Sequence, residues 1–236
     1  MVGTRLWLGA EISQHRDSEL IEKLIERVKR CASALGGAIL FCVDGLASYP
    51  GAIRKVFREK EPRGEIGRCR LIEWPNILIA QVIKQYEGHR VVGVTRKIYQ
   101  GTKQAVAQLI KESQAIGDIN TAFIERINGT FRSCLSALAR RTRSLAKKSS
   151  TLKSGVYLVG SLYNFCTEHE SLRLPGLFGG RKYIERTPAI AAGITGHCWS
   201  VEELLCFKVP PSRWSRPKQR GRPSNALKAL IARWNL

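Results

Sequence analysis

The sequence predicts an α/β fold, in which a mixed sheet is flanked by helices and followed by a helical and extended basic tail. Two apolar runs, at 38–43 and 76–83, have the length and composition of buried strands. In the segment 120–132, apolar residues recur with the 3.6-residue period of a helix. The chain has 236 residues, of which 44% are hydrophobic. This is enough for one sizeable core with an appendage.

The first half of the chain is expected to form a strand–helix–strand unit and a hairpin. A strand is predicted at 5–13, and Asp17 and Ser18 then begin a helix. A glycine pair ends the connection to the strand at 38–43, so both strands are placed in one sheet. The further elements predicted are a helix at 46–57 interrupted near Pro50, a loop at 58–70, the strand at 76–83, a hairpin turn at 87–90 and a strand at 91–95.

The second half is expected to be mainly helical. Helices are predicted at 101–116 and over 120–132, and the patterns at 137–152 and 155–165 give two helices or one long broken helix. The segment 175–188 is rich in Gly, Arg and Pro and is predicted to be a flexible connection. Short helices are expected after Thr187 and Ser200, an extended tail from Val209, and an amphipathic helix at 224–234.

The charge of the chain indicates a polyanionic partner. Its 39 Lys and Arg residues outnumber its 19 Asp and Glu residues, which gives a net charge of +20. Such a surplus is typical of proteins that bind phosphate backbones. Between residues 126 and 167 there is no acid, and the segment is interpreted as a basic helical flank. Its eight basic residues are Arg126, Arg132, Arg140, Arg141, Arg143, Lys147, Lys148 and Lys153.

The seven cysteines favour neither a disulfide framework nor a zinc ribbon, because no two of them have Cys-x-x-Cys spacing. A zinc site that combines Cys166 and His169 with His197 and Cys198 is an alternative to reduced thiols. No apolar run reaches about 18 residues, so a membrane span is not expected. Reduced cysteines predict a cytoplasmic protein.

Two carboxylates are candidates for a catalytic role. Asp44 ends the strand at 38–43, where open α/β sheets place their active sites. Glu125 lies on the helix over 120–132, on one face with Asn128 and Arg132. Two acids in a basic protein suggest metal-assisted phosphoryl transfer, since hard divalent ions prefer carboxylate oxygens. The alternative is that Asp44 is a turn residue and Glu125 an ion-pair partner of Arg126.

Longer motifs around both acids resemble a known family. The residues Val43-Asp44-Gly45 and Asn120-Thr-x-x-Ile-Glu125-Arg126-x-Asn128-x-Thr130-x-Arg132 resemble the DDE transposases of bacterial insertion sequences. The similarity continues through Tyr163-Asn164-Phe165-Cys166-x-x-His169 and Thr187-Pro188-Ala-x-Ala-Ala-Gly-Ile, and so covers nearly the whole chain.

The resemblance implies a ribonuclease-H-like integrase catalytic core, in which three acids hold two Mg²⁺ or Mn²⁺ ions. The implied activity is DNA strand cleavage and transfer during DNA transposition, a form of DNA recombination. Asp44 would be the second acid and Glu125 the third. Asn128 and Arg132 would contact DNA or steady Glu125.

The chain departs from the family pattern at its start. The first Asp of the family lies on a strand upstream of the one predicted at 5–13, and this chain has no residues there. Glu11 and Asp17 are the nearby acids, the first within the predicted strand and the second a helix cap. The resemblance is therefore to a transposase truncated at its N-terminus. Residues 1–174 would be the catalytic domain without its first strand or strands, with an inserted hairpin at about 76–100, and 175–236 a basic C-terminal region.

DNA is the partner that the resemblance implies, both as element ends and as target, with a homo-oligomer in the DNA complex and no membrane contact. The tail motif Pro217-Lys-Gln-Arg220-Gly221-Arg222-Pro223 resembles an AT-hook, whose arginines enter a narrow A·T minor groove; a basic linker is the alternative. The alternatives to a transposase are a non-catalytic DNA-binding remnant and a basic structural protein of a ribonucleoprotein. The DNA contacts expected are Arg126, Asn128, Arg132, Arg140, Arg141, Arg143, Lys147, Lys148, Arg220 and Arg222.

Overall fold

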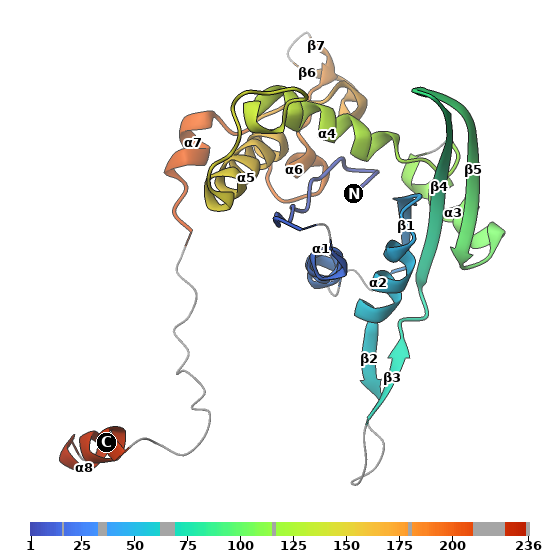
Figure 1. The fold of residues 1–236 in the computed structure, drawn as a ribbon. Helices are drawn as coiled ribbons and strands as arrows, with labels where there is room; N and C mark the ends of the chain where they lie inside the picture. The colour runs from blue at the N-terminus through green and yellow to red at the C-terminus, as the bar shows by residue number, and fades with distance from the viewer. Residues whose placement is uncertain are drawn as a thin grey trace. The chain divides into compact units, whose positions relative to one another are not determined.

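The structure is a computed structural model that describes residues 1–15, 17–32, 37–61, 69–114, 117–178, 181–209 and 225–234. The chain divides into two compact units, Met1–Leu205 and Cys206–Leu236. The first unit contains a mixed α/β arrangement of helices, a three-stranded sheet and two further hairpins (Figure 1). The mixed α/β class is thus confirmed, while the division of function after residue 174 stays a prediction.

The three-stranded sheet has the order β1-β4-β5 and consists of β1 (Ile39–Asp44), β4 (Ile77–Glu87) and β5 (Arg90–Gln100). β1 and β4 are parallel, with Ile39 opposite Ile77 and Asp44 opposite Val82, whereas β4 and β5 are antiparallel. Gly88 lies at the turn between them with a positive φ of 58°, a conformation that glycine adopts at little cost. The predicted strands at 38–43 and 76–83 and the hairpin turn at 87–90 are confirmed.

Helices cover both faces of this sheet. Alternate strand residues point to opposite sides, and the strands carry apolar residues on both. On one face, helices α1 (Ser18–Ala32) and α2 (Ser48–Val56) enclose a core that includes Phe41 and the fully buried Ile53 and Ile79. On the other face, Leu40 and Leu78 pack against α3 (Lys103–Gln114). The helix predicted at 101–116 is therefore confirmed for its described part.

The starts of α1 and α2 follow simple rules. Asp17 caps α1, since its Oδ1 accepts a hydrogen bond from the backbone N–H of Leu20 at 2.8 Å. In α2, Pro50 is the third residue and is buried. The first turn of a helix leaves its N–H groups without helical partners, so a proline is tolerated there. The interruption predicted near Pro50 was therefore wrong.

The segment at 58–70 was predicted as a loop, but its two ends are strands. β2 (Arg58–Glu61) pairs antiparallel with β3 (Arg70–Glu73). Arg58 lies opposite Glu73, and their side chains form an ion pair at 3.0 Å. Such cross-strand pairs of opposite charge stabilise a sheet that has few apolar residues.

The segment predicted as a strand at 5–13 is not a strand, so the expected strand–helix–strand unit does not form. Its backbone is bound by side chains of α5 (Ser149–Phe165) instead of by a neighbouring strand. Asn164 accepts from the N–H of Trp7 at 3.0 Å and donates to its carbonyl at 2.9 Å. The Tyr157 hydroxyl donates to the Ala10 carbonyl at 3.1 Å. Trp7 packs with Phe131 and Val156 in a second core between α4 (Ala122–Cys134) and α5.

The basic stretch after α4 is not the helix that was predicted at 137–152. A short 3₁₀ turn, η1 (Ser136–Leu138), is followed by irregular chain up to α5. The stretch has several like charges within four residues of one another, which oppose each other on a helix. Arg141 has a left-handed φ of 56°. The apolar pattern at 155–165 is confirmed as helical, within one helix that begins at Ser149.

The end of the first unit contains another hairpin. A 3₁₀ turn, η2 (Glu170–Leu172), leads to β6 (Leu174–Phe178), which pairs antiparallel with β7 (Arg181–Ile184). The prediction of a flexible connection at 175–188 was wrong for these strands. The predicted helix starts are confirmed at α6 (Pro188–Ala191) and α7 (Val201–Cys206). Thr187 accepts from the N–H of Ile190, and Ser200 from the N–H of Glu203.

The second unit contains α8 (Asn225–Trp234), which confirms the helix predicted at 224–234. The AT-hook-like motif with Arg220 and Arg222 lies outside the described residues. Within the described ranges, no helix combines the length and apolar character needed to cross a membrane.

Candidate active site

Asp44 is the last residue of β1, and its side chain is exposed. Its Oδ1 accepts a hydrogen bond from the backbone N–H of Leu46 at 3.1 Å, as expected of an acid in a turn. Gln81 of β4 also binds this turn. Its buried side-chain amide donates to the backbone carbonyls of Asp44 at 2.8 Å and Leu46 at 3.2 Å. The backbone of this turn is therefore held at the carboxyl end of the strand, and one carboxylate oxygen is bound to it.

Glu125 lies in the first turn of α4 and is held by two partners from different elements. Its Oε1 accepts from the Thr121 hydroxyl at 2.8 Å and lies 2.5 Å from Nζ of Lys84 on β4. These hydrogen bonds, that to Lys84 first and that to Thr121 second, lower the pKa of the Glu125 carboxyl below its usual value. The alternative that Glu125 pairs with Arg126 is therefore wrong.

The structure brings Asp44 and Glu125 to the same end and the same face of the sheet. Asp44 lies opposite Val82, and Lys84 follows two residues later on β4, so Asp44 and Lys84 project from one face. Because Lys84 binds Glu125, that carboxylate lies over this face as well. β1 has a second contact with the start of α4. Two residues before Asp44, the Cys42 thiol interacts with the backbone of Asn120, which lies just before α4.

The donors at this site are of the type that Mg²⁺ and Mn²⁺ require. Both side chains offer carboxylate oxygens, which are the preferred ligands of hard divalent ions. The ammonium of Lys84 already occupies a cation position at Glu125. In the part of the chain that the structure describes, however, no group of three or more His, Cys, Asp or Glu side chains is placed to hold a metal ion. Asp44 and Glu125 are thus a pair without a third acid among the described residues.

The two other acids considered from the sequence have structural partners. Glu11 accepts a hydrogen bond from Nε of Arg27 at 3.0 Å, and Lys153 lies 3.9 Å from its other oxygen. The bond to Arg27 lowers the pKa of Glu11. Asp17 caps α1, as described above.

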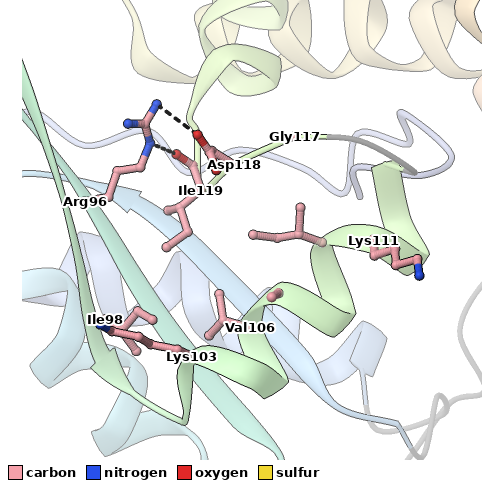
Figure 2. Close-up of a pocket in the computed structure, with 10 residues that line it drawn as sticks. Arg96, Ile98, Lys103, Val106, Lys111, Gly117, Asp118 and Ile119 are labelled. Atoms are coloured by element: carbon pink, nitrogen blue, oxygen red, sulfur yellow. Dashed lines mark hydrogen bonds and ion pairs between the residues drawn. The ribbon is translucent and has the colours of Figure 1, made fainter.

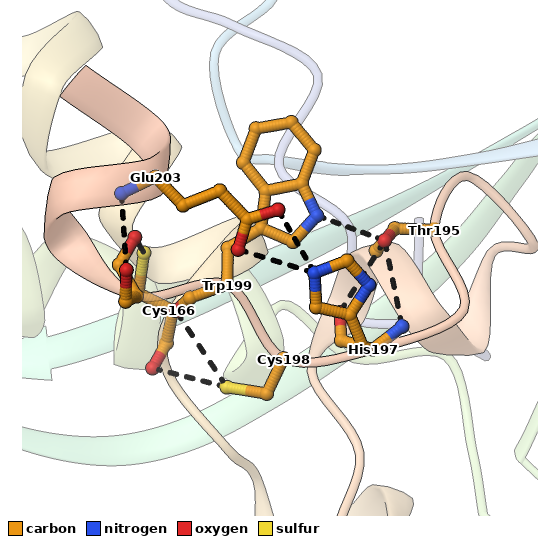
Figure 3. Close-up of polar contacts among 7 residues, drawn as sticks. Cys166, Thr195, His197, Cys198, Trp199 and Glu203 are labelled. Carbon is orange, nitrogen blue, oxygen red and sulfur yellow. Dashed lines mark hydrogen bonds and ion pairs between the residues drawn. The ribbon is translucent and has the colours of Figure 1, made fainter. Parts of the chain in front are cut away.

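The zinc alternative is not supported by the geometry. His197 turns its Nε2 towards Glu203, at 2.9 Å, while the Cys198 thiol donates to the carbonyl of Cys166 at 3.7 Å (Figure 3). His169 packs edge-on against the ring of Tyr163. These side chains therefore do not converge on one point.

The predicted DNA contacts that belong to the first unit lie at its surface, whereas Arg220 and Arg222 lie outside the described residues. Arg126, Asn128 and Arg132 are exposed on α4, and the last two share the helix face of Glu125. We call residues 139–148 the basic loop; it carries five exposed cationic side chains, for which the structure describes no ion pair. These five are Arg140, Arg141, Arg143, Lys147 and Lys148. The predicted basic flank is therefore exposed, but it is a loop and not a helix.

A pocket of about 220 Å³ lies between α3, β5 and the link 117–119, and it includes neither candidate acid (Figure 2). Arg96 of β5 spans its rim, donating from Nε to the Ile119 carbonyl at 2.9 Å and lying 3.9 Å from Asp118. These contacts hold the link that leads into α4. Arg96 therefore helps to place the start of α4, the helix that carries Glu125.

Sequence reasoning missed Lys84 and Thr121, which bind the Glu125 carboxylate, and Gln81, which holds the backbone at Asp44. Thr121 was noted as a member of the motif that begins at Asn120, but not as a partner of Glu125. A signal for Lys84 does exist, since it is the first charged residue after the apolar run of β4 and lies on the face of Val82.

Comparison of the chain with protein-family models, curated proteins and solved structures found no significant match.

Proposed function

We propose that this chain is a DDE-type transposase of an insertion sequence, with a ribonuclease-H-like catalytic core. The observation that carries the proposal is the placement of Asp44 and Glu125 at one end and on one face of the sheet. A parallel strand pair with an acid at its carboxyl end, flanked by helices on both faces, supports such a core. The motifs around both acids and at 163–169 and 187–194 support the family.

In the proposed reaction, Asp44 and Glu125 bind Mg²⁺ or Mn²⁺. When bound, these ions activate the attacking oxygen and stabilise the leaving oxygen of a phosphodiester. Gln81 holds the backbone at Asp44 by donating to its carbonyl, and the Thr121 hydroxyl orients the Glu125 carboxylate by donating to Oε1. Lys84 lowers the pKa of Glu125, because an adjacent ammonium favours the charged carboxylate.

DNA is the proposed substrate, both as element ends and as target. The basic loop and the exposed face of α4 offer Arg and Lys side chains within the stretch 126–167, which contains no acid. Their attraction for phosphates supplies affinity that does not depend on sequence. The exposed Asn128 and Arg132, close to Glu125 on α4, would position the strand to be cut.

A second candidate function is DNA binding without cleavage. It is favoured by the absence of a third acid beside Asp44 and Glu125 among the described residues. Two carboxylates hold a divalent ion less firmly than three, and positioning both reacting oxygens requires the full set of ligands. On this second reading, the chain binds DNA and does not cut it.

The test combines metal binding with DNA binding. Mn²⁺ binding is followed by electron paramagnetic resonance for the wild-type chain, Asp44→Asn and Glu125→Gln, with Glu61→Gln on the exposed strand β2 as matched control. Both site variants should lose Mn²⁺ affinity and keep DNA affinity, while the control keeps both. Mn²⁺ binding unchanged in both site variants would refute a metal site at these acids. DNA affinity that shows no salt dependence would refute the nucleic-acid function altogether.

A further inference from the structure

Three side chains without a role so far interact with one another, and two of them, Arg5 and Tyr163, also interact with Arg126. Arg5 comes from the N-terminal segment, Tyr163 from the last turn of α5, and His169 from the chain just after it. The rings of Tyr163 and His169 meet edge to face with centroids 4.6 Å apart. The Arg5 guanidinium lies 3.8 Å from the ring centroid of Phe123, which is one helical turn before Arg126 on α4.

Arg5 interacts electrostatically with each of the other three groups, and Tyr163 also with Arg126. Burial lowers the pKa of Arg5. Tyr163 raises this pKa, and Arg126 lowers it further. Burial raises the pKa of Tyr163, against the effect of Arg5 and Arg126. Burial and then Arg5 lower the pKa of His169. The interacting groups are thus cations and hydrogen-bond donors, and no acid is among the causes of these shifts.

Arg5 has a strained backbone conformation. Its φ of 58° lies in the left-handed region, which residues other than glycine rarely adopt. The position is fixed by the bond from Arg5 Nη1 to the Val2 carbonyl at 2.7 Å and by Asn164, which grips Trp7 two residues later. Such backbone strain is found at functional sites more often than elsewhere.

The cluster also contains hydrogen-bonding groups that lack partners. Nε2 of His169 is buried and has no hydrogen-bond partner within the residues that the structure describes. A buried polar atom without a partner is costly, and ligands commonly satisfy such atoms. The Arg126 side chain, although adjacent to Glu125, has no ion pair in the described chain. The cluster therefore has unused donors on several sides.

We propose that Arg5, Arg126, Tyr163 and His169 form a binding subsite for a phosphate group. Two guanidinium groups, a phenol hydroxyl and an imidazole N–H can all donate to the oxygens of a tetrahedral anion. Arg126 follows Glu125 on α4, and under the proposed function the phosphate is one of the bound DNA. In this last step the inference rests on the proposed function; the capacity to hold a phosphate does not.

The first test uses the ring signals of the histidines. The protein contains four histidines, so His15, His89 and His197 serve as internal references for His169 in nitrogen–proton correlation spectra. Inorganic phosphate and, separately, a short DNA duplex without terminal phosphates are titrated into the full chain. Both should shift His169 in a saturable way and raise its pKa, because a bound anion favours the imidazolium. If neither ligand moves His169, there is no subsite, and a response to free phosphate alone would rule out the DNA strand as its source.

The second test uses substitutions in the cluster. Arg126→Gln, at an exposed position, should abolish the His169 response to phosphate and lower the slope of log affinity for DNA against log salt by about 0.9. Tyr163→Phe should weaken phosphate binding by about 3- to 10-fold, as expected for one hydrogen bond. Arg5→Ala would also remove the packing against Phe123, so the test does not depend on it.

The matched control is Arg70→Gln, on the exposed strand β3, which should change neither the His169 response nor the slope. Equal effects of Arg126→Gln and Arg70→Gln would show that net charge alone is responsible, and would overturn the subsite. The metal-binding test above fails or succeeds independently. If Mn²⁺ does not bind but His169 responds to both ligands, the phosphate subsite stands and the transposase does not.

Discussion

Lys84 on β4 and Glu125 on α4, which are 41 residues apart in the sequence, form an ion pair with Nζ 2.5 Å from Oε1. The pair joins the sheet to the helix that carries the family-like motif. It also places a cation on an oxygen that a metal ion would need. A divalent ion that binds Glu125 through Oε1 therefore has to displace the ammonium.

The first prediction follows from this competition. Lys84→Met should raise the pKa of Glu125 towards its ordinary value and should increase the affinity for Mn²⁺. An exposed ion pair contributes about 0.2–1 kcal/mol, so the gain should be about 1.5- to 5-fold. The pKa is measured by carbon NMR of the carboxyl group, and Mn²⁺ affinity by electron paramagnetic resonance. Lys60→Met, on the exposed strand β2, is the control. A fall in Mn²⁺ affinity would mean that Lys84 supports the site instead of competing with the ion.

The second prediction concerns the pH dependence of stability. Glu11 is partly buried, and the hydrogen bond to Arg27 lowers its pKa in the folded state. A carboxyl with a lowered folded pKa stabilises the protein above its unfolded pKa of about 4.3, and this contribution is lost as pH falls through the folded value. Stability should thus decrease as pH falls from about 5, and the decrease should be smaller in Glu11→Gln. Thermal unfolding at several pH values checks this, with Glu61→Gln as control. Identical pH profiles for Glu11→Gln and the wild type would contradict it.

Local patterns were sufficient for much of the central sheet and for several helix starts. The apolar runs of β1 and β4 identify them as buried strands, since few polar residues interrupt them. Asp17, Thr187 and Ser200 were identifiable as caps, because capping depends on residues within one turn. The positions of Asp44 and Glu125 on their elements follow from the same local signals.

Contacts distant in sequence explain what could not be predicted. The segment at 5–13 has the composition of a strand, but its backbone groups are satisfied by Asn164 and Tyr157, which come from the other end of the first unit, so it needs no neighbouring strand. Lys84 could not be assigned to Glu125 without the register of the sheet. The hairpins β2–β3 and β6–β7 depend on pairing partners that short, polar strands do not reveal.

The third prediction tests the two hydrogen bonds between the Asn164 side chain and the Trp7 backbone. Asn164 is buried, so Asn164→Ala leaves the N–H and the carbonyl of Trp7 without these partners. Each unsatisfied group costs about 1–2 kcal/mol, and we expect a decrease of about 2–4 kcal/mol in the free energy of unfolding. Urea denaturation followed by tryptophan fluorescence measures it. Asn128→Ala, at an exposed position of α4, should change stability by less than about 0.5 kcal/mol. Equal decreases would show that the segment around Trp7 is not anchored by α5.

The fourth prediction concerns the space that α5 leaves for Trp7. A Cβ atom on Gly160 would overlap Cζ3, Cε3 and Cη2 of the indole ring, whereas one on Gly129 of α4 would meet nothing within 4 Å. Gly160→Ala should therefore destabilise the protein by about 1–3 kcal/mol through overpacking. Gly129→Ala should be neutral or stabilising, since alanine favours helices by about 1 kcal/mol over glycine. A Gly160→Ala protein as stable as the wild type would refute the close packing of this helix against Trp7.

The last prediction concerns the basic loop and DNA. Replacing Arg140, Arg143, Lys147 and Lys148 by Gln should lower the slope of log affinity against log salt by up to about 0.9 for each phosphate that the loop no longer neutralises. Fluorescence anisotropy with a labelled duplex, at about 50–200 mM salt, measures the slope. The four exposed residues Lys60, Arg70, Arg90 and Lys111, replaced by Gln together, give a control with the same change in net charge.

Comparing the two sets of substitutions distinguishes direct binding of phosphates by the basic loop from attraction by the net charge of the whole chain. Attraction that arises from the net charge of +20 would be reduced equally by both sets of substitutions, because each removes four positive charges. Direct binding of phosphates by the loop would disappear only in the first set, since each neutralised phosphate releases its own counterions. A larger decrease in the control set would move the DNA surface away from α4, and with it the reason to place a cleaved strand beside Glu125.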